Sequence, residues 1–284
     1  MKVLVLISTI DDGLLRVPDI LMPAEAEVFY IVSWQRTDAF MSLPHPTTDA
    51  EALLSARTDV QLTTLSGRGL CRNRNHAIDT ALSCLDHPLE DAIFVIADDD
   101  ERLLPAAFER LRAAYQRYPR MDGALWRLRS LTDGEYFKAY PPDIVRYGHH
   151  PRSYYPSSWE MTFRTRVWQT GLRFDERFGL GSEMLCAGEE DVLLTDMLRK
   201  GLNIFILPED IALTEPVTTG SRPLNTKVLR SKGALYGYQR SWPGAVMRCL
   251  REAASLAVRH RRNPWSILQQ LLQGVKYIRQ CKKG

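Results

Sequence analysis

The chain has 284 residues, of which 45% are hydrophobic, 25% charged and 9% aromatic. This composition is that of a globular protein, and it excludes a disordered or fibrous chain. The net charge of +3 is unevenly spread, because the residues from Ser241 onward hold nine Lys and Arg against Glu252 alone, which gives +8 and leaves −5 for the rest. Five widely spaced cysteines without a C-x-x-C pair predict neither a disulfide framework nor a zinc site, so a reducing, cytosolic compartment is expected.

The first hundred residues contain four short apolar runs that are typical of buried strands. Helical patterns lie between them, and this alternation predicts βαβ units, an α/β class and a mostly parallel central sheet flanked by helices. A polar turn that includes Thr9 follows the first run. The four predicted strands are Val3–Ile7, Val28–Ser33, Val60–Leu65 and Ile93–Ile96.

A Gly-containing turn after the third predicted strand opens a helix near Leu70. Arg68, Arg72 and Arg74 lie in or beside its first turns. Exposed N–H groups at a helix N-terminus, together with guanidinium groups, suit a diphosphate. The alternative is a solvated basic helix start, although arginines oppose the helix dipole there unless an anion is bound.

Three aspartates follow the fourth predicted strand without a break: Asp98, Asp99 and Asp100. Neighbouring carboxylates repel one another, and a hard divalent cation with oxygen ligands would relieve the repulsion. In open α/β sheets, ligands bind at the carboxyl ends of the strands. The alternative is a solvated acidic turn that caps a helix predicted over residues 103–118.

A second acidic cluster, Glu189-Glu190-Asp191, opens a helix that is predicted to end before Gly201. These carboxylates would stabilise the helix dipole whatever else they do. Beside a cation site, one of them would also suit a general base that accepts a proton from an incoming hydroxyl.

Two further helices are predicted at the end of the chain, over 241–260 and 264–280. The second has Trp265 and four aliphatic residues on one face and a basic end. A basic amphipathic helix of this kind can lie on an anionic membrane. Docking of the same face on the catalytic domain explains the pattern equally well. No nucleic-acid-binding motif accompanies the basic residues.

Taken in order, these motifs resemble the family 2 glycosyltransferases of the GT-A fold, especially bacterial enzymes that build surface polysaccharides. The resemblance covers most of residues 1–220. It implies a Rossmann-like catalytic domain over 1–220 and a C-terminal helical extension over 221–284. The four motifs are Gly-Leu-Cys-Arg-Asn-Arg-Asn (69–75), Asp-Asp-Asp-Glu (98–101), Phe-Asp-Glu-Arg-Phe-Gly-Leu-Gly (174–181) and Gly-Glu-Glu-Asp (188–191).

The resemblance also implies roles for individual residues. The aspartate run corresponds to the family's DXD motif, with Asp98 and Asp100 as contacts to Mn²⁺ or Mg²⁺ and Asp98 and Asp99 as contacts to the donor. Thr9, Arg68 and Arg74 are similar to residues that bind the nucleotide. In the second cluster, Glu190 corresponds to the catalytic base, with Asp191 as its rival and Glu189 beside them, and the reaction is expected to invert the anomeric carbon.

One position departs from the family. A histidine usually follows the strand after the base helix, and this chain has Glu215 in that region. Glu215 is an oxygen ligand that would favour Mg²⁺ or Mn²⁺ over softer ions, or it is a loop residue without a metal role.

The expected function is therefore metal-dependent transfer of a hexose from a nucleotide-sugar, with a UDP-sugar favoured, to a saccharide or lipid-linked acceptor. Two alternatives stay open. A nucleotidyltransferase would need a lysine-bearing glycine-rich loop near the N-terminus, and residues 8–13 contain no lysine or arginine. A non-catalytic nucleotide-sugar-binding relative would account for Glu215. The expected location is the cytoplasm, with peripheral contact to the membrane and no nucleic acid as partner.

Overall fold

The structure is a computed structural model, and it describes residues 1–42, 47–87, 90–151, 153–215 and 223–281. The chain divides into two compact units, each with its own core. The predicted domain boundary between residues 220 and 221 lies outside the described residues. The first unit comprises residues 1–68, 72–173 and 196–216, and the second comprises 69–71, 174–195 and 217–284.

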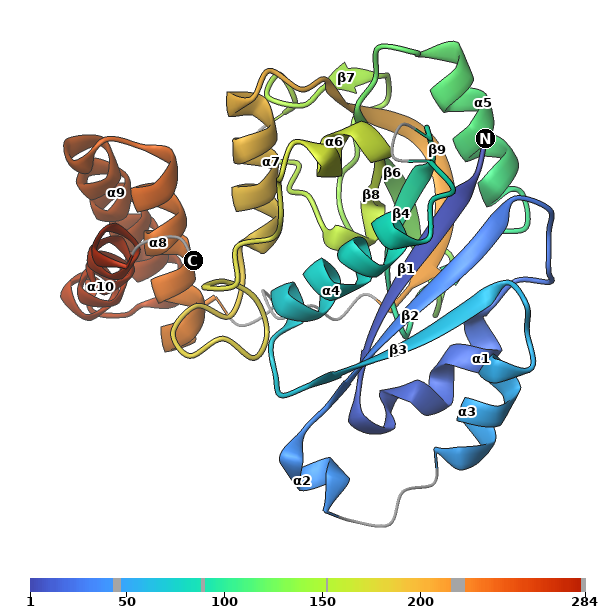
Figure 1. Cartoon of the computed structure of the whole chain (residues 1–284). Helices are drawn as coiled ribbons and strands as arrows, with labels where there is room; N and C mark the ends of the chain where they lie inside the picture. Colours follow the sequence, from blue (N-terminus) through green and yellow to red (C-terminus); the bar gives the residue numbers. More distant parts are fainter. Residues whose placement is uncertain (43–46, 88–89, 152, 216–222, 282–284) are drawn as a thin grey trace. The chain divides into compact units, whose positions relative to one another are not determined.

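The described residues form one nine-stranded sheet, which belongs to the first unit (Figure 1). Its strand order is β3-β2-β1-β4-β8-β6-β9-β5, and β7 pairs with β9. The predicted α/β class is confirmed, and all four strands predicted in the first hundred residues are present. The strands are β1 Val3–Ile10, β2 Val28–Arg36, β3 Val60–Ser66, β4 Ile93–Asp98, β5 Arg102–Leu103, β6 Gly123–Ser130, β7 Val145–Arg146, β8 Met161–Arg164 and β9 Ile204–Thr214.

Strands β1 to β4 run parallel to one another, as continuous apolar runs predict for strands covered on both faces. Val3, Val5 and Ile7 of β1 share one core with residues of α3 and α5. Residues at alternate positions face the other side, where Phe94 contacts Trp168 of α6 and where α4 also lies (Figure 1). The helices of this unit are η1 Asp11–Arg16, α1 Val17–Ile20, α2 Asp38–Met41, α3 Thr48–Ser55, α4 Leu70–Ser83, α5 Ala107–Arg117, η2 Ser158–Glu160 and α6 Thr165–Gln169.

The helix expected over 103–118 begins later than predicted, at Ala107. The preceding backbone is used by the sheet, because Arg102 and Leu103 form β5 against β9 and the N–H of Leu104 donates to the carbonyl of Ile211. This pairing holds the segment after the aspartates at the carboxyl end of β9.

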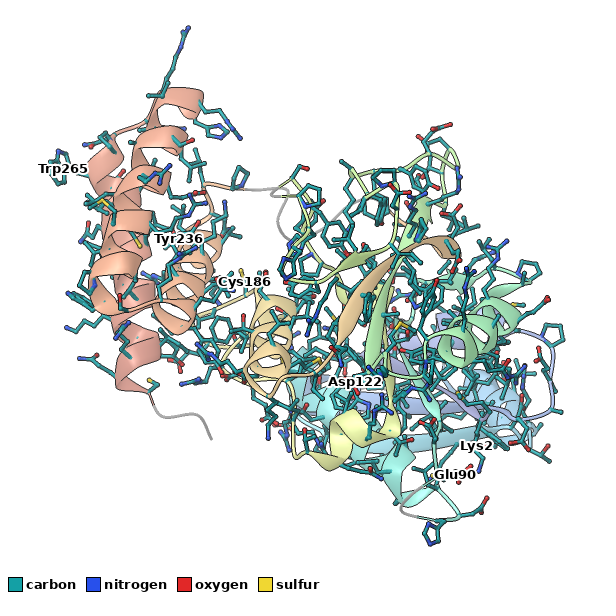
Figure 2. The ribbon with its side chains drawn as sticks, turned by 90° about the horizontal axis from the view of Figure 1, so that it is seen from above. Lys2, Glu90, Asp122, Cys186, Tyr236 and Trp265 are labelled. Carbon is teal, nitrogen blue, oxygen red and sulfur yellow. The ribbon has the colours of Figure 1, made fainter. Side chains whose placement is uncertain are left out.

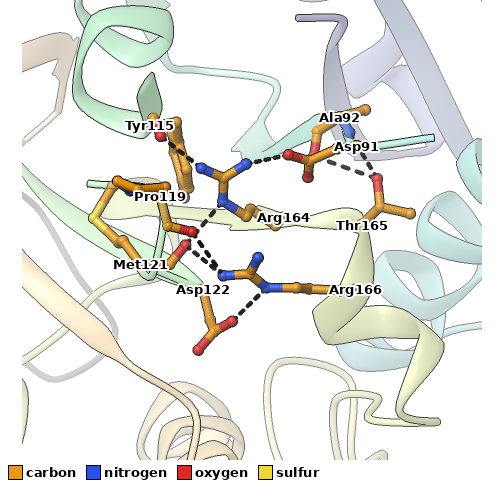
Figure 3. A network of polar contacts seen from close by, with 9 residues as sticks. All are labelled: Asp91, Ala92, Tyr115, Pro119, Met121, Asp122, Arg164, Thr165 and Arg166. Atoms are coloured by element: carbon orange, nitrogen blue, oxygen red, sulfur yellow. Dashed lines mark hydrogen bonds and ion pairs between the residues drawn. The ribbon is translucent and has the colours of Figure 1, made fainter. Parts of the chain in front are cut away.

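Strand β8 was not predicted. It runs antiparallel between β4 and β6, and polar contacts fix its end (Figure 3). The buried guanidinium of Arg164 donates to the carbonyl oxygens of Met121, at 2.9 Å, and Tyr115, at 2.5 Å, and forms an ion pair with Asp91. Arg166 pairs with Asp122 at 2.6 Å. At this amino end of β4 every carboxylate named has an arginine partner.

The second unit contains α8 Thr226–Gln239, α9 Trp242–His260 and α10 Pro264–Gln280. The last two match their predictions, whereas α8 was not predicted. Helices α8 and α10 cross with their backbones in contact. A Cβ on Gly233 would lie 1.8 Å from the carbonyl oxygen of Leu271, and one on Gly274 would lie 1.9 Å from that of Arg230. Only glycine permits this approach.

Helix α7, Glu189–Arg199, starts in the second unit and ends in the first. Its residue Val192 belongs to a buried cluster with Ala234 of α8 and Ile278 of α10. The start of α7 is therefore packed directly on the C-terminal helices. Among the helices of the described ranges, none combines the length and apolarity that crossing a membrane requires.

Candidate functional site

The aspartate run lies where β4 ends. Asp98 is the last residue of β4, and Ser8 of the adjacent strand β1 is its partner in the register. The residues that follow these two strands therefore meet: the hydroxyl of Thr9 donates to the Asp99 carboxylate at 2.5 Å. Thr9 and the aspartates are brought together at one edge of the sheet.

Two arginines contact the run. Arg74 on α4 is 2% exposed, and its Nη2 donates to both Asp98 oxygens at 3.0 Å and to the Ser158 hydroxyl at 2.7 Å. Arg16 in η1 donates to Asp99 at 2.5 Å. Arg74 thus holds an aspartate directly, whereas the resemblance implied a nucleotide contact for it.

The acids at residues 98–101 carry more negative charge than Arg74 and Arg16 can balance. Glu101, 3% exposed, follows the three aspartates, and neither of its carboxyl oxygens has a hydrogen-bond partner among the described residues; the same holds for Oδ1 of Asp100. Burial raises the pKa of Asp99 and Asp100, and the neighbouring carboxylates raise the pKa of Asp100 further. The pKa of Glu101 is raised well above its ordinary value, first by burial and then by Asp98 and Asp100.

The turn after β1 approaches the aspartates closely at Gly13. A Cβ at this position would lie 2.3 Å from the Asp99 carboxylate and 2.6 Å from the Thr9 hydroxyl. The backbone at residue 13 therefore lies so close to the Asp99 carboxylate that only glycine fits there.

A long loop between β6 and β8 supplies further contacts. The indole N–H of Trp159 in η2 donates to Asp98. The next residue, Glu160, is fully buried and pairs with Lys138, whose side chain is 2% exposed. Glu160 also accepts hydrogen bonds from the hydroxyls of Tyr140, at 3.0 Å, and Tyr154, at 2.5 Å. This buried network fixes η2 and, through it, the indole on Asp98.

Sequence reasoning missed four of the residues around the aspartates: Gly13, Arg16, Ser158 and Trp159. One signal is present in the sequence, because Arg16 is the first cation after β1 and follows the polar turn at residues 8–13. The contacts of Trp159 and Ser158 depend on where a long irregular loop ends, which local patterns do not give.

The two remaining residues that were predicted to bind the nucleotide-sugar or the metal are exposed, unlike the aspartates. Arg68 is exposed in the turn before α4. Glu215 is exposed after β9, and its carboxylate accepts from Thr132 at 3.4 Å. The pairing of Arg102 with Leu213 places Glu215 on the same edge of the sheet as the aspartates.

The described residues contain no group of three or more His, Cys, Asp or Glu side chains arranged to hold a metal ion. A Mg²⁺ ion bound with a diphosphate takes only one or two carboxylates from the protein. The buried, unpaired Oδ1 of Asp100 and the oxygens of Glu101 fit that smaller requirement. Asp98 and Asp99 are engaged by Arg74 and Arg16.

The second acidic cluster is in the second unit, at the first turn of α7 as predicted. Glu189 is 4% exposed and faces the backbone of Gly179, where a Cβ would lie 3.3 Å from its carboxylate. Glu190 and Asp191 are half-buried. Of the three acids, Glu189 is therefore the least accessible to a substrate. That Glu190 faces the aspartates of the first unit stays a prediction.

Comparison with known proteins shows which solved structures have a similar fold. No protein-family profile and no curated protein sequence matches the chain. Among solved structures, residues 1–349 of TarS from S. aureus are similar to it, with a TM-score of 0.57, 15% identity and coverage of 97% of this chain and 81% of that one. A longer TarS structure matches with a TM-score of 0.52 and 13% identity over 88% of this chain and 42% of that one.

The chain shares the fold of TarS. TarS is a wall teichoic acid glycosyltransferase, and the sheet with flanking and C-terminal helices agrees with its structure. The likeness at this identity concerns the fold alone. Membership of family 2, which the four motifs suggested, stays a prediction.

Proposed function

We propose that the chain is a glycosyltransferase that moves a hexose from a nucleotide-sugar, with a UDP-sugar favoured, to a saccharide or lipid-linked acceptor in the synthesis of a surface polysaccharide. The observation that carries this proposal is the surplus of buried carboxylates at the ends of β1 and β4 in a glycosyltransferase fold. Ligands of open α/β sheets bind at this edge. A lipid-linked acceptor would bring the protein to a membrane surface.

Asp100 would bind a Mn²⁺ or Mg²⁺ ion together with the diphosphate of the donor. When bound, such an ion acts as a Lewis acid that stabilises negative charge on the departing diphosphate. Asp98 and Asp99 form ion pairs with Arg74 and Arg16. They would therefore mainly orient the donor, and Asp100 would be the principal ligand of the ion. Glu215 remains the outer candidate ligand on the same edge of the sheet.

Glu190 would remove the proton from the acceptor hydroxyl as that oxygen attacks the anomeric carbon. A base must be ionised and accessible, and Glu190 has more access to solvent than Glu189. Attack from the face opposite the leaving diphosphate inverts the anomeric carbon. Asp191, with the same exposure class, is the rival for this role.

Two substitutions separate binding from transfer. Asp100→Asn should abolish the rise in melting temperature that UDP-sugars with Mn²⁺ cause, because a ligand bound only by the folded state raises its stability. Glu190→Gln should keep that rise but lose transfer by about 10²-fold or more. Glu109→Gln on the exposed side of α5 is the matched control and should change neither.

The products decide between reaction classes. A glycosyltransferase releases a nucleoside diphosphate, whereas a nucleotidyltransferase releases inorganic diphosphate. Full activity in Asp100→Asn would exclude the proposed cation site. Loss confined to Asp191→Asn would move the base by one residue. Ligand-induced stabilisation without any transfer by the parent chain would favour a non-catalytic nucleotide-sugar-binding protein.

A further inference from the structure

The turn between α9 and α10 exposes large apolar side chains at the tip of the helical bundle. Val258 is 83% exposed and Trp265 is 72% exposed. Figure 2 shows Trp265 projecting outward from the bundle. Two large exposed apolar groups in one short turn make this tip a candidate contact surface.

The apolar face of α10 itself is not available for such contact. Leu268, Val275 and Ile278 are between 0% and 8% exposed and belong to the cores formed with α8 and α9. The expectation that this helix lies flat on a membrane through that face is therefore wrong. The face packs on α8 and α9, with Ile278 in one cluster with Val192 of α7, and not mainly on the predicted catalytic domain. Only Trp265 of the predicted apolar face stays outside.

The same tip is strongly basic. Arg259, Arg261 and Arg262 are exposed, and within the described ranges none of them forms an ion pair. Glu252, which is the one acid after residue 240, is already bound by Lys232 at 3.0 Å and Arg248 at 3.6 Å. The tip therefore combines an indole, a valine and three uncompensated positive charges.

The backbone gives an independent indication. Arg261 ends α9 in the left-handed conformation, with φ 52° and ψ 50°, and its N–H donates to the carbonyl of Ala257. Glycine is the residue that adopts this conformation without steric cost. An arginine at this position makes the folded state less stable than a glycine would. Its presence therefore indicates that the side chain has a role other than folding.

We propose that the α9–α10 turn, residues 258–266, is a docking site for an anionic membrane surface. Trp265 and Val258 enter the interface between headgroups and acyl chains, and the three arginines contact lipid phosphates. Charge complementarity selects this occupant, because exposed apolar groups in the same short segment as three arginines without ion-pair partners among the described residues match a bilayer with negative headgroups. The proposal does not depend on glycosyl transfer, since the lipid surface itself is the ligand.

The test is sedimentation of the full chain with vesicles of phosphatidylcholine containing phosphatidylglycerol, compared with phosphatidylcholine alone. The parent chain should bind the anionic vesicles preferentially, and added salt should release it. Trp265→Ala should lower the partition coefficient about tenfold.

Arg261→Gly gives the sharpest result, because its effects on binding and on folding differ in sign. The partition coefficient should fall about fivefold through loss of one positive charge, while the melting temperature stays equal or rises. Arg120→Gly removes an exposed charge from the first unit and should leave binding unchanged. A structural role for Arg261 would instead lower the melting temperature.

Three results would overturn the proposal. The first is equal binding to both kinds of vesicle, the second is parental binding by Arg261→Gly, and the third is binding to RNA without binding to anionic vesicles. Each is measurable without knowing the substrate of the protein.

Discussion

The two ends of strand β4 carry opposite arrangements of charge. At its amino end, Arg164 and Arg166 are matched with Asp91 and Asp122 and with backbone carbonyls (Figure 3). At its carboxyl end, four consecutive acids meet two arginines, and buried oxygens of Asp100 and Glu101 are left without partners in the described residues. Charge that the protein satisfies itself serves stability, whereas buried charge that it leaves unsatisfied indicates a site for a ligand.

Arg164→Met tests the amino end and should have the largest effect. It removes the donors to two buried carbonyl oxygens and the partner of Asp91. We expect the free energy of unfolding to fall by about 3 kcal/mol, because buried acceptors lose their hydrogen bonds. Urea denaturation measures the change. A loss of ligand binding in molecules that remain folded would contradict the contrast between the two ends.

Glu101→Gln tests the carboxyl end of β4. It should raise the free energy of unfolding, whereas Arg164→Met should lower it. Without ligand at pH 8, we expect the variant to be more stable than the parent by about 1–3 kcal/mol, because a buried unpaired charge is removed. The control is the same substitution at exposed Glu109.

The pH dependence follows from the raised pKa of Glu101. The folded state holds a proton that the unfolded chain releases, so the contribution of this group to stability is complete below the ordinary pKa of 4.5 and is lost as the pH rises through the folded-state pKa. The difference between parent and variant should therefore shrink from pH 8 to pH 4. A difference that is independent of pH would show that charge is not its cause.

Trp159→Phe removes the indole N–H that donates to Asp98 while keeping an aromatic ring. We expect KM for the nucleotide-sugar to rise about tenfold or somewhat more with little change in kcat, because one hydrogen bond to a charged group is worth about 1.5 kcal/mol. Steady-state kinetics check this. A lower kcat at constant KM would assign the indole to the transition state instead of to donor binding.

Arg166→Met should have the smallest effect. Its side chain is 45% exposed, and exposed ion pairs contribute about 0–1 kcal/mol. We expect a change in stability in that range, against the larger loss in Arg164→Met. Equal losses in the two variants would mean that burial does not set the strength of the amino-end contacts.

The sequence predicted one of these two ends well. Continuous apolar runs located β1 to β4, and the acids after β4 were visible because charge rarely follows a buried strand directly. The amino end was not predicted, because β8 is a four-residue strand placed by contacts with distant segments. The partners of the aspartates were missed for the same reason, since Trp159 and Arg16 are 61 and 83 residues away from them in the chain.

The close crossing of α8 and α10 at Gly233 and Gly274 has a mechanical consequence. Backbones in contact leave no compressible layer between these helices, and the same pair is packed against the start of α7 through Val192. The helix pair and the start of α7, which carries Glu190, therefore form one packed body. Anchorage of the α9–α10 turn would restrict the motion of that body as a whole.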